Sequence, residues 1–163
     1  MVAKKTQQRL FAQYFKQSKE FSLRVFGCSM APLINKGNIL IVEKIGQRPL
    51  KIGDVVIFPG TEIPFVAHRI IKIKHQDTKN LQYLIKGDNT FSTDGWFAKK
   101  DLYAVVKTII KKHHRAISLR SWQWQCLSFL VLYLPGFRSL LSVLKVVYNH
   151  LYDKKKSSTT IRR

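Results

Sequence analysis

The chain has 163 residues, of which 45% are hydrophobic, and its 29 lysines and arginines against 9 aspartates and glutamates give a formal net charge of +20 at pH 7. This length suits one domain, and the hydrophobic fraction excludes a wholly disordered chain. The two cysteines, Cys28 and Cys126, are far apart without spaced partners, which excludes a disulfide framework and a zinc site. The charge favours polyanionic partners, either nucleic acid or anionic lipid headgroups.

Residues 1–20 predict a short amphipathic helix. Thr6 is a suitable N-cap, and apolar side chains share one helical face after it: Leu10, Phe11, Tyr14 and Phe15. The stretch contains no apolar core segment of a secretory signal.

Residues 21–112 predict a β-rich domain. Short runs of β-forming residues lie at 21–26, 38–45, 54–58, 65–74, 81–86 and 103–110, with glycine and proline turn signals between them. Because no helix-length segment separates these runs, we expect antiparallel strands in a mainly β sheet or barrel.

Residues 113–152 predict a basic and apolar helical segment, followed by a disordered basic tail at 153–163. The uncharged run from 121 to 137 is shorter than the roughly 20 apolar residues that span a bilayer. Trp122, Trp124 and Tyr133 suit a membrane interface, so we expect peripheral or monotopic membrane association. The alternative is a cytoplasmic protein in which this segment packs on the β-domain.

The stretch "VFGCSMAP" places Ser29 between apolar residues where a strand ends. A turn explains Gly27 and Pro32 but not this serine. A serine hydroxyl becomes a nucleophile only when a base takes its proton and donors stabilise the oxyanion. His68 in "PFVAHRII" is the best candidate base, although a histidine on an apolar strand face is more often structural.

Four ordered boxes then carry a family resemblance: "GCSMAPLI", "KIGDVVIF", "IPFVAHRIIKI" and "IKGDNTFSTD". Together they resemble the signal peptidase I family, in particular its endoplasmic-reticulum and archaeal branch, which uses a serine–histidine pair. The resemblance extends from Phe21 to about Ile110, and it implies a signal-peptidase/LexA-like β-fold and a serine-type endopeptidase.

The resemblance also implies site residues. Ser29 matches the nucleophile, His68 the general base and Asp94 the acid that orients the histidine, with Asp88 as the nearby alternative acid. The backbone N–H of Ser29 would be one oxyanion donor, with Gly27 permitting the tight turn. No cofactor or metal is expected. The expected substrate is a peptide bond in an exported or dedicated precursor.

Two other functions remain open from the sequence. LexA-type relatives join a similar β-domain to a DNA-reading helix–turn–helix, but residues 1–21 hold only one helix, which makes nucleic-acid binding the less favoured interpretation. A non-catalytic β-domain that serves as a binding module is the other alternative.

Overall fold

The computed structural model describes residues 19–121 except 47–48, 62, 76–80 and 112–114, and isolated residues at positions 6, 10, 13, 124, 126, 127, 130 and 143. Between residues 19 and 121 the secondary structure is a series of strands and one 3-10 turn. In chain order these are β1 (Glu20–Arg24), β2 (Ile39–Lys44), β3 (Val55–Phe58), β4 (Val66–His75), β5 (Leu81–Lys86), β6 (Gly95–Ala98), η1 (Lys99–Asp101), β7 (Ala104–Ile110) and β8 (Ala116–Ser118).

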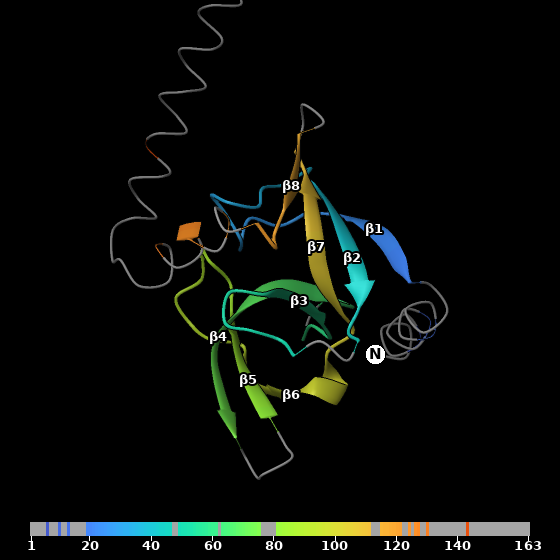
Figure 1. The fold of residues 1–163 in the computed structure, drawn as a ribbon, viewed down its shortest axis with the longest axis vertical. Helices are drawn as coiled ribbons and strands as arrows, with labels where there is room; N and C mark the ends of the chain where they lie inside the picture. Colours follow the sequence, from blue (N-terminus) through green and yellow to red (C-terminus); the bar gives the residue numbers. More distant parts are fainter. Residues whose placement is uncertain are drawn as a thin grey trace, which may run out of the picture.

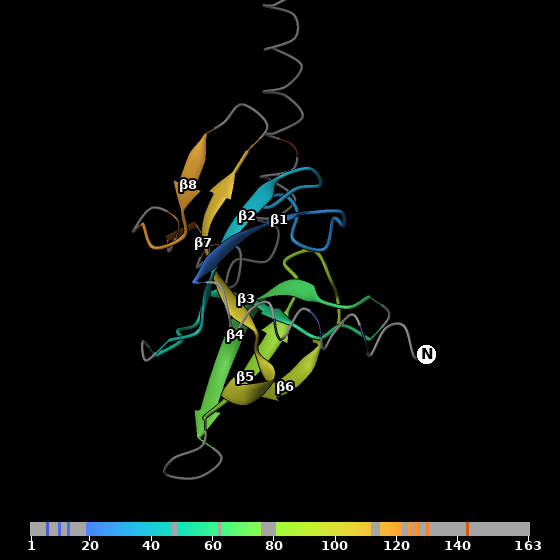
Figure 2. The same ribbon diagram turned by 90° about the vertical axis from the view of Figure 1, so that its right-hand side faces the viewer.

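All strand pairs are antiparallel, and the strands form one sheet in the order β1-β2-β7-β3-β4-β5-β6, with β8 also paired to β7. Strand β7 pairs with β2 on one side. On its other side β3 pairs at Ala104 and Val105, and β8 pairs at Thr108 to Ile110. In both views, β1, β2, β7 and β8 form the upper half of the molecule and β3 to β6 the lower half (Figures 1 and 2). Strand β7 therefore joins the two parts of the sheet, because it pairs with β2 in one part and with β3 in the other.

Two hydrophobic cores lie on opposite faces of β3, all four residues of which are buried. Val55 and Ile57 belong to the first core, which includes Leu40, Val42 and Ile109. The alternate residues of β3 belong to the second core, whose members include Val56, Phe58, Ile70, Tyr83 and Ile85. Because successive side chains of a strand point to opposite faces, β3 contributes to both cores, and its neighbour β4 is buried from residue 68 to residue 70.

The predicted mainly β, antiparallel fold is confirmed, and the six predicted runs correspond to β1 to β5 and β7. Two strands were missed. β6 has only four residues, and β8 lies in the range predicted to be helical, where hydrogen bonding to β7 determines the conformation.

Most of the expected N-terminal helix, most of the expected helical C-terminal segment and the whole tail fall outside the described residues. In the described part of the chain, no helix has the length and apolar character needed to cross a membrane. Trp124, predicted for a membrane interface, is instead 4% exposed and packs in the first core. For this residue the alternative of packing on the β-domain is the correct one.

Candidate active site

The candidate nucleophile lies in the loop that joins β1 to β2. Val25 N–H donates to Asn38 O over 2.9 Å and Gly37 N–H donates to Val25 O over 2.8 Å, so the ends of the loop are held together. Gly37 has a φ of 86°, a left-handed conformation that glycine adopts without strain. The loop follows this course because its apolar residues, Met30, Leu33 and Ile34, are buried in the first core. Ser29 is left half-buried at the core's margin.

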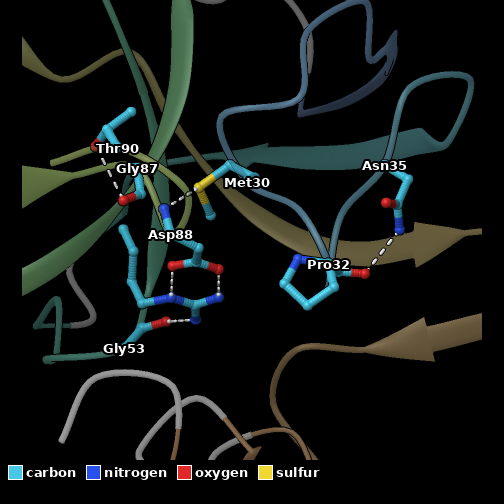
Figure 3. A network of polar contacts seen from close by, with 8 residues as sticks. Met30, Pro32, Asn35, Gly53, Gly87, Asp88 and Thr90 are labelled. Atoms are coloured by element: carbon cyan, nitrogen blue, oxygen red, sulfur yellow. Dashed lines mark hydrogen bonds and ion pairs between the residues drawn. The ribbon is translucent and has the colours of Figure 1, made fainter. Parts of the chain in front are cut away.

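Side-chain amides close the second half of this loop. Asn35 N–H donates to the Oδ1 of buried Asn38 over 2.9 Å, and Asn35 Nδ2 donates to Pro32 O over 2.7 Å (Figure 3). Together with the core contacts, these bonds restrain the turn that carries Ser29.

His68 lies in β4, with its side chain on the face shared by Val66 and Ile70, and it is 6% exposed. Its Nε2 lies 2.7 Å from Ser29 Oγ, and its Nδ1 lies 2.7 Å from Asp94 Oδ2. In the arrangement with an ionised carboxylate and a neutral ring, Nδ1–H donates to Asp94 and Nε2 accepts from the serine hydroxyl. The structure thus brings the three predicted residues into one hydrogen-bonded chain.

Asp94 ends the loop between β5 and β6, which begins at Gly87. Its own N–H donates to Ile85 O over 2.8 Å, and its side chain is 28% exposed. The acid is therefore held at the end of β5 by the backbone, and its side chain is partly exposed to solvent.

Asp88, the alternative acid, lies elsewhere. Its carboxylate accepts two hydrogen bonds from the Arg69 guanidinium, from Nε over 2.8 Å and from Nη2 over 2.7 Å. The bond to the histidine is made by Asp94, while Asp88 forms a buried ion pair. Sequence reasoning missed Arg69 as its partner; the local signal was an arginine in the buried first half of β4, directly before Ile70.

The predicted need for glycine at position 27 is not met by the structure. Gly27 has no left-handed φ, and a Cβ there would meet no heavy atom within 4 Å. The steric requirement lies at Gly87, where a Cβ would lie 2.9 Å from Ser29 O and 3.0 Å from His68 Nε2. The sequence signal for this residue was its place in "KGDN", which was interpreted as a turn within a family box, without a steric role for the glycine.

An apolar pocket of about 140 Å³ opens beside Ser29. One wall comes from the end of β1 and the residues after it, and the other from the start of β4. The apolar lining residues include Val25, Phe26, Ile63, Phe65 and Ala67. Phe26 is 76% exposed and Ile63 is 55% exposed, so apolar surface extends from the pocket to its rim.

Other ionisable residues in the described part of the chain form no metal-binding cluster. No three His, Cys, Asp or Glu side chains within it gather where they could hold a metal ion. His75 is exposed at the end of β4, and Cys28 and Cys126 are exposed thiols.

An antiparallel β-fold that links a serine, a histidine and an aspartate by hydrogen bonds has the arrangement of a Ser–His–Asp hydrolase. The model of the Peptidase S24-like family matches residues 3–91, more than half of the chain, and the chain belongs to this family.

The relatives it resembles are signal peptidase subunits. The chain is 33% identical over 88 residues to the signal peptidase complex catalytic subunit SEC11C of Homo sapiens, covering 48% of this chain and 45% of that protein. It is 39% identical over 87 residues to the signal peptidase complex catalytic subunit SEC11 of Scheffersomyces stipitis, covering 52% of this chain and 51% of that one. The chain spans about half the length of these relatives, and the resemblance to signal peptidases is confirmed.

Proposed function

We propose that the chain is a serine endopeptidase of signal-peptidase type, with Ser29 as nucleophile, His68 as general base and Asp94 as the acid that orients the histidine. One observation carries this proposal: the two 2.7 Å hydrogen bonds that join Ser29 Oγ to His68 and His68 to Asp94. Membership of the Peptidase S24-like family and the likeness to SEC11 catalytic subunits support it.

In the proposed mechanism, Ser29 Oγ attacks the scissile carbonyl carbon while its proton passes to His68 Nε2. Asp94 stabilises the imidazolium that forms, and the backbone N–H of Ser29 donates to the oxyanion. The tetrahedral intermediate collapses, the C–N bond breaks, and the leaving amine takes the proton from His68. A water molecule that loses a proton to His68 then hydrolyses the ester, which restores Ser29 and releases the new carboxyl end.

We propose that the substrate lies extended beside the site as an added strand. Strand β1 lies at the edge of the sheet and ends at the pocket wall, which supports this placement. The small apolar pocket beside Ser29 suits small side chains before the scissile bond, as in signal sequences. An exported or dedicated precursor protein is therefore the proposed substrate, in keeping with the names of the relatives.

The test is cleavage of an internally quenched peptide with Ala-Xaa-Ala before the scissile bond. Ser29→Ala and His68→Ala should remain folded and lose at least about 10³-fold in kcat, because the members of such a triad act as a unit. Ser92→Ala and His75→Ala, at exposed positions with the same residue types, are the matched controls and should keep wild-type rates. Full activity of either site variant would end the proposal. Wild-type protein that does not cleave the peptide would favour the alternative of a non-catalytic binding module.

The proposed role in precursor processing is tested by comparing the free protein N-termini of cells that make the wild type with those of cells that make Ser29→Ala. We expect precursor-derived N-termini, preceded by small residues, to disappear in the variant. An unchanged set of N-termini would contradict a role in precursor processing.

We also propose membrane association, peripheral or monotopic, through the segment after residue 121, supported by the charge of +20 and by Trp122 and Tyr133 in that segment. Flotation with anionic liposomes, compared with salt-dependent retention on DNA, distinguishes this from nucleic-acid binding. Binding to DNA without flotation would favour the nucleic-acid alternative.

A further inference from the structure

A buried ion pair between Arg69 and Asp88 lies next to the candidate active site, because Arg69 directly follows His68 in β4. The Arg69 and Asp88 side chains are 0% and 1% exposed. Besides its two bonds to the carboxylate, the guanidinium donates from Nη1 to Gly53 O over 2.8 Å. The electrostatic attraction within a buried ion pair is largely offset by the cost of removing both charges from water. A buried pair therefore does not by itself indicate a large contribution to the stability of the fold. Its position in the molecule indicates a different use.

The pair joins the segments that carry the three site residues. Arg69 follows His68 in β4, and Asp88 belongs to the loop that ends at Asp94. The same loop contacts the nucleophile, because Asn89 N–H donates to Ser29 O over 2.6 Å.

A further contact reaches the residue after the nucleophile. Asp88 N–H donates to Met30 Sδ over 3.4 Å, and this contact and the carboxylate end of Asp88 can be followed in Figure 3. Asp88 therefore contacts β4, which carries His68, through its side chain, and it contacts the loop that carries Ser29 through its backbone N–H.

A residue outside the family-matched range covers the pair. The guanidinium carbon of Arg69 lies 5.7 Å from the centroid of the Trp124 ring. Trp124 is 4% exposed and is linked to the end of β8, since its N–H donates to Ser121 Oγ, which donates to Ser118 O. An aromatic face over a guanidinium attracts it and keeps water away, and both effects strengthen a buried pair.

We propose that the Arg69–Asp88 pair, covered by Trp124, is a positioning device that holds the Asp94 loop and the Ser29 loop in register with His68. Its catalytic consequence rests on the proposed function. The three residues touch no reacting atom; they act through His68, Asp94 and Ser29. A purely structural pair would change the melting temperature without changing the geometry of the histidine.

The main test replaces both charges by apolar residues in the variant Arg69→Met/Asp88→Leu, because paired apolar replacements of a buried ion pair commonly keep a protein folded. We expect kcat on the Ala-Xaa-Ala peptide to fall about 10- to 100-fold, with KM changed less than about 3-fold, since small misplacements of reacting groups are costly. Unchanged kcat in the folded double variant would overturn the proposal.

A readout that needs no substrate is the downfield proton NMR line of His68 Nδ1–H, identified by its loss in Asp94→Asn. We expect this line to broaden or vanish in the double variant. If the double variant fails to fold, Asp88→Asn keeps the shape and one acceptor oxygen while removing the charge, and the same two readouts apply to it. An unchanged line and unchanged kcat in Asp88→Asn would equally overturn the proposal.

The role of Trp124 as a cover over the ion pair is tested by comparison with Trp96, because each of these two rings contacts a cation. We expect Trp124→Ala to lower kcat about 3- to 10-fold and Trp124→Phe, which keeps an aromatic face, to restore most of it. Trp96→Ala is the matched control, because Trp96 is 37% exposed with Lys74 Nζ 4.3 Å from its ring centroid. Equal losses in Trp124→Ala and Trp96→Ala would contradict a specific role for Trp124.

The two proposals fail in different ways. Wild type and Ser29→Ala that cleave equally would remove the peptidase mechanism, while the His68 line would still report whether the pair positions the ring. A wild type that cleaves, together with a double variant of wild-type kcat and NMR line, would remove only the positioning role.

Discussion

Two sides of Ser29 differ in how they are built. The polar side consists of His68, Asp94, the Arg69–Asp88 pair and Gly87, and its side-chain hydrogen bonds are 2.7 to 2.8 Å long. The apolar side consists of the pocket wall and rim, with Phe26 76% exposed and Ile63 55% exposed. The first is complete without a substrate, whereas the second presents apolar surface to water.

On the proposed mechanism, this difference separates the groups that carry out the chemistry from those that bind the substrate. Groups that transfer a proton must be in place before the substrate arrives, because ordering them during the reaction would raise the barrier. Apolar rim residues gain their contacts only when a substrate covers them. Changes on the polar side should therefore lower kcat, and changes on the apolar side should raise KM.

The largest effect on kcat is expected at Asp94, on the polar side. Asp94→Asn keeps the shape but lets an amide donate toward Nδ1, which favours the tautomer with its proton on Nε2, where it can no longer accept from Ser29. We expect kcat to fall about 10³- to 10⁴-fold, measured on the quenched peptide with a thermal melt to verify folding. Asp101→Asn, at an exposed aspartate in η1, is the control, and near-wild-type kcat in Asp94→Asn would show that the acid is not part of the mechanism.

A smaller effect is expected at Gly87. A Cβ 2.9 Å from Ser29 O and 3.0 Å from His68 Nε2 would force one of them to move, so Gly87→Ala should lower kcat about 10²-fold with little change in KM. Steady-state kinetics of this variant are compared with those of Gly46→Ala, where a Cβ would meet nothing within 4 Å. Wild-type kinetics in both would mean that the close approach has no catalytic importance.

The smallest effect is expected on KM, from a change on the apolar side. Phe26→Ala removes apolar surface at the pocket rim, and losing about 1 kcal/mol of substrate contact would raise KM roughly 5-fold at unchanged kcat. Phe91→Ala is the matched control, since Phe91 is fully exposed and does not line the pocket. A fall in kcat in Phe26→Ala, or an equal rise of KM in both variants, would argue against a separate recognition side.

Local patterns predicted most of the strands because period-two alternation and turn residues are encoded over a few neighbouring positions. They failed for β6, a four-residue strand that begins at the left-handed Gly95, and for β8, whose conformation depends on pairing with Thr108 to Ile110 of β7. Both strands exist because a partner strand supplies hydrogen bonds that no local pattern records.

The mainly β class, the positions of six strands and, through four ordered boxes, the three candidate site residues could be predicted from the amino-acid sequence. Three features became visible only in the folded chain: which of two aspartates contacts His68, the close approach at Gly87 rather than Gly27, and the packing of Trp124 in the core over Arg69. They depend on contacts between residues far apart in the chain, since Ser29 and His68 are separated by 39 residues and His68 and Asp94 by 26. Only the packing of separate strands and loops determines which of these side chains meet.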